Sequence, residues 1–229
     1  MKAILLAAGF GTRLQPITNF IPKCLVPIKG KPLLEIWLEN LTLSGVNDIL
    51  INTHYLPEHV NQFVLKSRFS SYCKITFEEN LLGTAGTLLK NLDFMGNEDC
   101  MLIHADNYCL ANFEDFIKAH NNRPKNCLLT LMTFRTENPS SCGIIELDSD
   151  NIVIGFHEKV ENPPGNVANG AVYILSVDFI KLLKHEFSEA KDFSTEIINN
   201  FLGKIYTFET KETFIDIGTI KTFLNANIN

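Results

Sequence analysis

The first half of the chain alternates between short apolar runs and longer segments with apolar residues at helical spacing. Continuous apolar runs are typical of buried strands, and apolar residues at every third or fourth position are typical of helices. A proline suits the first turn of a helix, so helices are expected to begin at Pro32 and Pro57. Strands are predicted at 2–8, 48–53, 73–77, 100–104 and 127–134, and further helices at 83–92 and 113–120. This order predicts an α/β fold with a mostly parallel sheet and helices on both of its faces.

After residue 140 the regular alternation of predicted strands and helices ends. Two apolar runs, 143–147 and 152–156, flank a polar Asp-Ser-Asp-Asn stretch and predict a hairpin. The rest is expected to hold strands at 171–175, 204–208 and 214–217 and helices at 177–185, 192–201 and after Thr219. The chain shows no repeat and no linker-like composition, so a single domain over residues 1–229 is expected.

Composition narrows the class of protein. The hydrophobic content of 45% is enough for a sizeable core, and the net charge of −6 offers no basic face for a nucleic acid. No signal peptide follows Lys2, and no apolar stretch approaches the roughly 20 residues that cross a membrane. The six cysteines show no metal-binding spacing. We therefore expect reduced thiols in a cytoplasmic protein that binds neither nucleic acid nor membrane.

The loop Gly9–Lys23 carries the strongest chemical signal. It follows the first apolar run and begins with Gly-Phe-Gly, which allows backbone N–H groups to approach phosphate oxygens closely. Arg13 and Lys23 add two cations, one as a planar fork and one as a point charge. The loop is thus suited to hold a polyphosphate.

Other interpretations of this loop fit less well. A Walker A loop needs Gly-Lys-Ser/Thr after four intervening residues, and no such string is present. A dinucleotide fingerprint needs a third glycine where Leu14 stands. A simple turn at Gly9 and Gly11 would leave Arg13 and Lys23 unexplained.

The loop resembles the signature of the sugar-1-phosphate nucleotidyltransferases: a strand, then Gly-x-Gly-Thr-Arg-Leu-x-Pro-x-Thr, then Pro-Lys. Every position of that pattern is filled here, by Gly9, Gly11, Thr12, Arg13, Leu14, Pro16, Thr18, Pro22 and Lys23. The resemblance implies a three-layer Rossmann-like fold with a mixed, mostly parallel sheet. It also implies transfer of a nucleotidyl group from a nucleoside triphosphate to a sugar 1-phosphate.

Two carboxylates follow strands that should end near this loop. Ligands of open α/β sheets bind outside the carboxyl ends of the strands, and Asp106 and Asp216 both follow predicted strands. Their oxygens suit Mg²⁺, which binds one or two carboxylates together with substrate phosphates. The resemblance assigns a Mg²⁺ ion to this pair. Either residue alone could equally serve as a helix cap or turn residue.

His104 precedes Asp106 and could be taken for a general base. The attacking sugar phosphate is already an anion, so it needs positioning and charge screening more than deprotonation. A supporting role for His104 is therefore expected, and a structural role for His157.

The acceptor side is expected to use the element Phe156-His-Glu-Lys159 and the stretch Asn166–Gly170. The resemblance places Lys159 on the phosphate of the sugar and Glu158 near the sugar hydroxyls or beside Lys159. Amide side chains both donate and accept hydrogen bonds, which suits a sugar. Asp192 and Ser194 are further candidates, although Asp192 also has the pattern of a helix N-cap.

The segment Glu79–Thr87 resembles the base-recognition segment of the family, and its Leu-Gly-Thr-Ala-Gly form resembles the mannose-1-phosphate guanylyltransferase-like subgroup. The resemblance implies a nucleotide-binding part at 1–140, a sugar-phosphate part at 141–203 and closing elements at 204–229. Arg13, Lys23 and Asp106 are the expected catalytic residues. The nucleotide is assigned to Leu6, Ala7, Ala8, Gly9, Gly11, Thr12, Arg13, Lys23, Asn80, Gly83, Thr84 and Ala105. The sugar phosphate is assigned to Asn107, Gly143, Glu158, Lys159, Asn169, Gly170, Asp192 and Ser194.

The sequence thus predicts an enzyme of nucleotide-sugar biosynthesis that uses GTP and the 1-phosphate of mannose or a related hexose or heptose. UTP, CTP and dTTP stay open as nucleotides. A glycosyltransferase would show Asp-x-Asp, but position 108 is Tyr. A regulatory nucleotide-sugar sensor could have lost Arg13, Lys23 or an aspartate, and all are present. Exposed apolar surface on the acceptor side would permit a homodimer.

Overall fold

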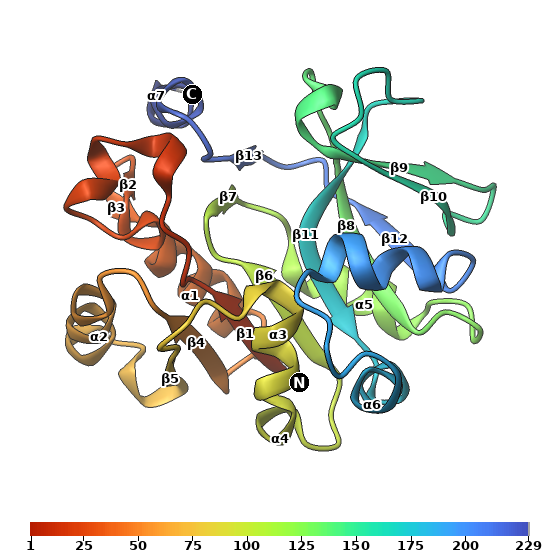
Figure 1. Ribbon diagram of the computed structural model, residues 1–229, viewed down its shortest axis with the longest axis horizontal. Helices are drawn as coiled ribbons and strands as arrows, with labels where there is room; N and C mark the ends of the chain where they lie inside the picture. Colours follow the sequence, from red (N-terminus) through yellow and green to blue (C-terminus); the bar gives the residue numbers. More distant parts are fainter. Residues whose placement is uncertain (229) are drawn as a thin grey trace. The chain divides into compact units, whose positions relative to one another are not determined.

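A computed structural model describes residues 1–228 (Figure 1). The chain divides into two compact units, each made of separate stretches of sequence. The first unit comprises residues 1–81, 103–113 and 212–229, and the second comprises residues 82–102 and 114–211. Strand β6 (Cys100–His104) and helix α5 (Phe113–Asn121) run across the unit boundaries. The functional division at about residues 140 and 203 stays a prediction.

The first unit contains a parallel array that matches the predicted strands. Strand β1 (Lys2–Leu6) pairs with β4 (Ile49–Thr53), and β4 pairs with β5 (Cys73–Phe77), both in parallel (Figure 1). Helices α1 (Leu33–Leu43) and α2 (Pro57–Lys66) follow β1 and β4 in sequence and begin at the predicted prolines or one residue after. Burial explains why β4 appears in the sequence as an apolar run, since every residue of this strand is buried.

Two short strand pairs of the first unit were not predicted in full. Strand β7 (Asn107–Cys109) pairs antiparallel with β13 (Phe214–Asp216), and β2 (Pro27–Ile28) pairs with β3 (Lys31–Pro32). Only β13 was expected as a strand, because elements of two or three residues are too short to show a period. The unit closes with helix α7 (Ile220–Ile228), whose start is capped by the predicted Thr219, with Thr222 N donating to Thr219 Oγ1 over 3.2 Å.

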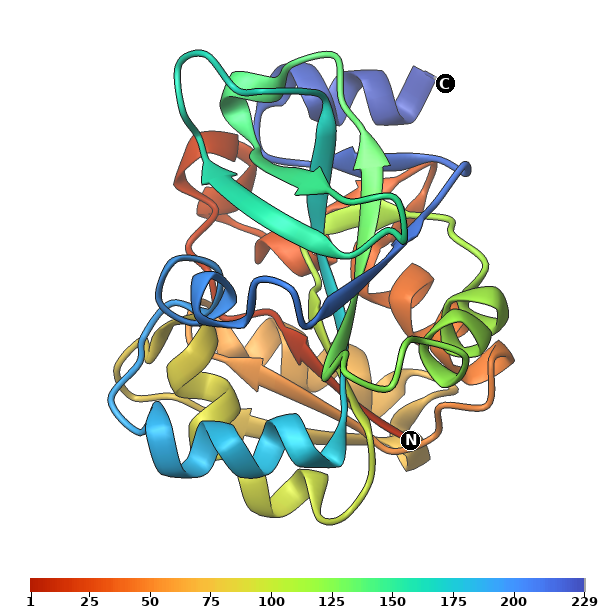
Figure 2. The same ribbon diagram turned by 90° about the vertical axis from the view of Figure 1, so that its right-hand side faces the viewer.

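The second unit holds the antiparallel part of the fold. Strands β9 (Gly143–Leu147) and β10 (Val153–Glu158) form the predicted hairpin, which Figure 2 shows in green and teal. Strand β11 (Val167–Leu175) begins earlier than predicted and pairs antiparallel with β8 (Leu129–Arg135), which pairs in parallel with β12 (Ile205–Glu209). The sheet is therefore mixed, and the predicted three-layer α/β fold class is confirmed.

The helices of the second unit differ from the prediction in detail. The expected helix at 83–92 is α3 (Gly83–Lys90) followed by the short α4 (Leu92–Met95). The expected helix at 192–201 is a π-helix, η6 (Phe193–Ile197), continued by a 3-10 turn, η7 (Ile198–Phe201). Helix α6 (Val177–Glu186) matches the prediction and is capped by Ser176. Among the described residues, no helix is both long and apolar enough to cross a membrane.

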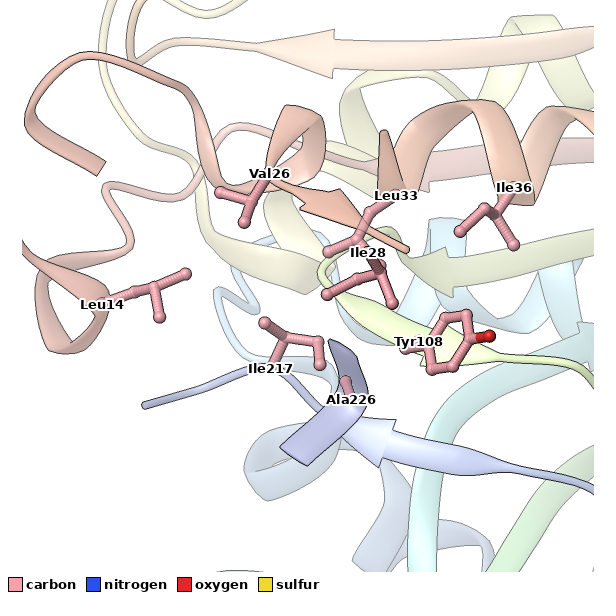
Figure 3. Close-up of a cluster of buried hydrophobic side chains, with 8 residues drawn as sticks. All are labelled: Leu14, Val26, Ile28, Leu33, Ile36, Tyr108, Ile217 and Ala226. Carbon is pink, nitrogen blue, oxygen red and sulfur yellow. The ribbon is translucent and has the colours of Figure 1, made fainter. Parts of the chain in front are cut away.

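A buried apolar cluster of the first unit ties the predicted phosphate loop to β7, α1 and the end of the chain (Figure 3). Leu14 comes from the loop, Tyr108 from β7, and Ile217 directly follows Asp216. Each fully buried aliphatic side chain contributes about 1.5–3 kcal/mol relative to an exposed one. The cluster therefore fixes the base of the loop beside both predicted metal ligands. Its members are Leu14, Val26, Ile28, Leu33, Ile36, Tyr108, Ile217 and Ala226.

Candidate active site

The predicted nucleotide loop leaves the carboxyl end of β1. Ala7 N donates to Asn52 Oδ1 over 2.7 Å, and Ala105 N donates to Leu6 O over 3.1 Å. Both bonds fix the backbone at the point where the strand ends. Gly9 and Phe10, the next residues of the loop, are exposed.

Gly11 could not be replaced by another residue without strain. Its φ angle of +65° lies in the left-handed region that favours glycine. A Cβ atom there would lie 2.9 Å from Thr18 Cγ2 and 3.1 Å from Lys23 Cβ, and Thr18 Oγ1 donates to Gly11 O over 2.8 Å. The loop therefore folds back on itself between Gly11 and Lys23. Thr12 and Arg13 are left exposed, while Leu14 is buried beneath them.

Lys23 lies between the two carboxylates predicted as metal ligands. Its Nζ donates to Asp106 Oδ2 over 2.7 Å and lies 3.8 Å from Asp216 Oδ1. The Lys23 side chain is only 9% exposed, whereas those of Asp106 and Asp216 are 37% and 48% exposed. The carboxylates thus face solvent while the ammonium group supports them from the protein side.

Strand pairing explains why residues so far apart in sequence meet. In the β7–β13 ladder Asp216 is paired with Asn107, the neighbour of Asp106. Trp37 Nε1 donates to Asn107 O over 2.9 Å and holds β7 against α1. The predicted acceptor residue Asn107 is itself buried in this ladder.

Arg13 also belongs to this charged centre, beside Gly218. A Cβ atom on Gly218 would lie 3.1 Å from both carboxylate oxygens of Asp216 and 3.2 Å from Arg13 Nη2. Only a residue without a side chain leaves both groups in place. We call Arg13, Lys23, Asp106 and Asp216 the charged centre.

The charges of this centre keep Asp106 ionised. Burial alone would raise the pKa of Asp106, but the charges of Lys23 and His104 and the hydrogen bond from Lys23 lower it below its ordinary value. The supporting role expected for His104 stays a prediction. Two carboxyl groups that reach solvent side by side are a fitting donor set for a hard divalent cation. In residues 1–228 no group of three or more His, Cys, Asp or Glu side chains could hold a metal ion. A Mg²⁺ ion held by two carboxylates completes its shell with water and substrate phosphates.

In the second unit, Tyr173 connects several of the predicted acceptor residues. Asn169 Nδ2 donates to Tyr173 Oη over 2.8 Å, and Ser194 Oγ lies 3.5 Å from the same oxygen. Burial raises the pKa of Tyr173 to about 12; its bonds to Ser194 and Asn169 oppose this, and the charges of Asp192 and Glu158 add to it. The phenol is therefore protonated and can link β11 to η6.

Asn169 sits at an irregularity of β11. The register between β11 and β8 shifts between Asn169 and Tyr173, and Ala171 has a left-handed φ of +52°. Asn169 Oδ1 accepts from Ala171 N over 2.8 Å and caps this bulge. The amide is thus partly used by the fold, and its NH₂ group keeps one further hydrogen.

Glu158 and Lys159 lie together at the end of β10. Lys159 Nζ and Glu158 Oε1 form an ion pair over 2.9 Å, and the Lys159 side chain is 60% exposed. Lys159 has a left-handed φ of +49°, and its N donates to Cys142 O over 3.1 Å. Gly143 lies beneath them, because a Cβ atom there would lie 2.6 Å from Glu158 Oε2.

Residues assigned to the nucleotide and to the acceptor meet at the start of α3. Thr84 Oγ1 accepts from Phe193 N over 2.7 Å and lies 3.4 Å from Asp192 Oδ2. Gly83, with a φ of +80°, approaches the backbone of Lys191 so closely that a side chain would collide with it. Asp192 Oδ1 accepts from Thr195 N over 2.8 Å, which is the N-cap geometry foreseen as the alternative for this residue. Asn80 is exposed in the first unit and Gly170 is buried in β11.

Sequence reasoning missed four residues that shape these places: Thr18, Asn52, Tyr173 and Gly218 did not appear as site residues. Asn52 carried a usable signal, since it is a polar residue at the carboxyl end of an otherwise apolar strand. Thr18 was noted only as part of a motif, and the role of Gly218 depends on a distant Arg13 that no local pattern reveals.

Comparison with known proteins agrees with this geometry. The model of the nucleotidyl transferase family matches residues 2–229, nearly the whole chain. The chain belongs to the nucleotidyl transferase family. It is 30% identical over 237 residues to a mannose-1-phosphate guanyltransferase from Saccharomyces cerevisiae, with all of this chain and 64% of the yeast protein covered. The chain thus spans slightly less than two thirds of that relative. It is also 30% identical to a D-glycero-alpha-D-manno-heptose 1-phosphate guanylyltransferase from Campylobacter jejuni, with both proteins covered completely.

Solved structures of nucleotidyl transferase chains share the fold. A putative glucose-1-phosphate thymidylyltransferase from Bacillus anthracis, solved with sucrose, superimposes with a TM-score of 0.87 at 24% identity, covering 100% of this chain and 94% of that one. HddC from Yersinia pseudotuberculosis, complexed with GMP-PN, superimposes with a TM-score of 0.81 at 26% identity, covering 99% and 98%. Nucleotidyl transferases generally use a divalent metal ion, and the carboxylates of the charged centre fit that requirement.

Proposed function

We propose that this nucleotidyl transferase is a guanylyltransferase that joins GTP to the 1-phosphate of mannose or of a related hexose or heptose. The observation that carries the proposal is the charged centre, in which one nearly buried Lys23 supports two solvent-facing carboxylates beside Arg13. The names of the yeast and Campylobacter relatives support guanine as the base and a manno-configured sugar as the acceptor. The Leu-Gly-Thr-Ala-Gly stretch of α3 supports the same subgroup.

In the proposed reaction, a phosphate oxygen of the sugar 1-phosphate attacks the α-phosphorus of GTP. The bond between the α-phosphorus and its bridging oxygen breaks, and pyrophosphate leaves with that electron pair. Neither reactant needs to lose a proton, because the attacking phosphate is an anion near neutral pH. The chain therefore has to position two anions and screen their repulsion.

Each residue of the loop has a place in this scheme. Backbone N–H groups from Gly9 onward would bind phosphate oxygens, and Arg13 would neutralise charge on the triphosphate and on the departing pyrophosphate. Lys23 would hold Asp106 and Asp216 in register and offer its remaining N–H groups to a phosphate oxygen. Asp106 and Asp216 would hold a Mg²⁺ ion, which supplies charge screening between the two substrates when bound.

The acceptor is assigned to residues of the second unit. The exposed ammonium group of Lys159 is suited to the phosphate of the sugar, and Glu158 to its hydroxyls. The remaining N–H of Asn169 can donate to a sugar oxygen, since its other polar positions are used by Tyr173 and Ala171. The six thiols, none of which forms a disulfide, support the proposed cytoplasmic location.

The test is a matrix of substrates. Purified protein with Mg²⁺ is incubated with each of GTP, UTP, CTP and dTTP against 1-phosphates of mannose, glucose and manno-heptose. Pyrophosphate is measured by a coupled assay and the product by mass spectrometry. We expect the highest kcat/KM for GTP with a manno-configured acceptor.

Two other outcomes have clear meanings. A preference for UTP, CTP or dTTP would overturn the choice of base while keeping the reaction class. Tight binding of a nucleotide sugar without pyrophosphate release from any pair would instead favour the regulatory sensor.

A further inference from the structure

The segment Asn52–Tyr55, which comprises the end of β4 and the two residues after it, contacts the nucleotide loop and Ala7, just before the loop, through three side chains. Asn52 Oδ1 accepts from Ala7 N over 2.7 Å. The ring of His54 meets the ring of Phe10 edge-on, with centroids 5.3 Å apart. Together with those made by Tyr55, these contacts reach from Ala7, just before the loop, to Thr18 in its middle.

Tyr55 is the third side chain of this segment that contacts the loop, at positions further along the chain. Its hydroxyl donates to Thr18 O over 2.9 Å, and its ring lies 5.5 Å from the ring of Phe10. Thr18 in turn donates through Oγ1 to Gly11 O over 2.8 Å. A hydrogen-bonded path therefore runs from Tyr55 through Thr18 to Gly11, the glycine of the loop with a left-handed φ angle.

Glu78 anchors the segment from the opposite side. Its Oε1 accepts from Asn52 Nδ2 over 3.0 Å, and its backbone oxygen lies 2.8 Å from His54 Nδ1. A carbonyl oxygen only accepts, so His54 carries a proton on Nδ1. Glu78 is completely buried, and its own N donates to Thr53 O over 2.8 Å.

Ala7 and Glu78 together fix which way the Asn52 amide points. The N–H of Ala7 can only donate, so it faces the amide oxygen, and the NH₂ group of Asn52 then faces Glu78 Oε1. Without the Glu78 acceptor the NH₂ group would lose this bond, and the amide would no longer be held in the orientation that accepts from Ala7 N. A buried N–H without a partner costs about 1–3 kcal/mol, and the start of the loop would shift to avoid it.

We infer that Glu78, Asn52 and Tyr55 are positioning residues for the nucleotide loop, acting on Ala7 and Thr18 and making no contact of their own with the reacting atoms. This inference rests on the proposed function, because it assigns the loop to a nucleoside triphosphate. It explains why a buried amide lies in the apolar strand β4 and a fully buried carboxylate directly follows β5. It also adds residues outside the signature motif to the nucleotide-binding half of the site.

The test compares GTP affinity, measured by isothermal titration calorimetry without a sugar phosphate, among matched variants. Glu78→Leu removes the acceptor, and Glu78→Gln keeps an oxygen that can accept from Asn52. We expect roughly three- to tenfold weaker GTP binding for Glu78→Leu, the size of one lost hydrogen bond, and near-normal binding for Glu78→Gln. In turnover, the KM for GTP should rise in the same order while the KM for the sugar phosphate stays unchanged.

Tyr55→Phe keeps the inference testable if Glu78→Leu fails to fold. It removes only the hydroxyl that bonds Thr18 O and should weaken GTP binding roughly threefold, whereas Tyr72→Phe, at an exposed tyrosine of the same unit, should not. Unchanged GTP affinity in the folded Glu78→Leu and Tyr55→Phe proteins would overturn the inference alone. A wild-type protein that binds no triphosphate would overturn the proposed function and the inference together.

Discussion

Lys23 shows how one side chain can define a site. A lysine that is 9% exposed would be costly without a partner, and here Asp106 and Asp216 supply two negative charges. Removing either carboxylate would leave part of the positive charge of Lys23 uncompensated. The sequence could reveal Lys23 and the aspartates as candidates, because each follows a strand or belongs to a motif. It could not reveal that the ammonium group lies between them.

At the scale of single residues, the close contacts of Gly218 predict that a substitution there lowers activity. Gly218→Ala would add a Cβ atom within about 3.2 Å of Arg13 Nη2 and Asp216, whose flexible ends must move. We expect kcat/KM to fall on the order of 10- to 100-fold, because small displacements of catalytic groups are costly, with little change in the free energy of unfolding. Gly165→Ala is the control, since a Cβ atom there meets nothing within 4 Å. Equal kcat/KM values for both variants would contradict this role of Gly218.

His120 allows a prediction about pH in the second unit. Its Nδ1 lies 2.8 Å from Thr130 Oγ1 and its Nε2 lies 3.2 Å from Asp99 Oδ2. Burial lowers the pKa of His120, although the hydrogen bond to Asp99 opposes this. The pKa of Asp99 is lowered chiefly by its hydrogen bond with His120, against the effect of burial.

Both shifts have the same sign for stability. Below about pH 6.5, the ordinary pKa of histidine, the unfolded chain binds a proton at His120 that the folded chain does not. The free energy of unfolding should therefore fall as the pH drops below about 6.5, with Asp99 adding a further fall below about pH 4. Urea titrations at several pH values would give the free energy of unfolding of each variant. This free energy should fall less steeply with decreasing pH for His120→Gln than for His185→Gln, a substitution at an exposed position of α6. Parallel curves would contradict the assignment.

At the scale of elements, the nucleotide loop combines left-handed backbone with close packing. Gly11 and Gly30 both have positive φ angles, of +65° and +80°, but only Gly11 is crowded by Thr18 and Lys23. Substitutions at these two positions therefore distinguish the effect of backbone strain, expected at both, from the effect of close packing, expected only at Gly11.

Gly30→Ala should lower the free energy of unfolding by about 1–2 kcal/mol from backbone strain alone. Gly11→Ala should lower it further and should also weaken GTP binding, because the new Cβ atom would push away Thr18 Cγ2 and Lys23 Cβ. Chemical denaturation and calorimetry of the two variants would measure this difference. Equal losses of stability with equal GTP affinities would show that the packing around Gly11 has no functional effect.

Local pattern predicted the long elements well and the short ones poorly. Strand β4 forms a clear apolar run and helix α2 has enough residues for a helical period, whereas β7 has only Asn107–Cys109. The pairing of β7 with β13 places Asp216 near Asp106, and it depends on a contact between residues more than a hundred positions apart. The bulge of β11 at Asn169 likewise arises from pairing with β8, which no local sequence signal specifies.

At the scale of the whole molecule, the fold class followed from the strand–helix order and the family from the loop motif. The two compact units are interleaved in sequence, so no division of the chain at single positions could anticipate them. All six cysteines are free thiols. Burial raises the pKa of Cys24 and Cys109 to about 12 and that of Cys73 to about 11. Such thiols are protonated and unreactive near neutral pH.

The central claim is that guanylyl transfer depends on the charged centre. The most direct measurement is pyrophosphate release from GTP and mannose 1-phosphate, with Mg²⁺, by wild-type protein and by Asp106→Asn, Asp216→Asn and Asp178→Asn. Asp178 is an exposed aspartate of α6 paired with Lys181 and serves as the matched control. We predict a loss on the order of 10²–10³ in kcat for the first two variants, no loss for Asp178→Asn, and folded protein in every case. Near-normal turnover by both Asp106→Asn and Asp216→Asn would contradict the account.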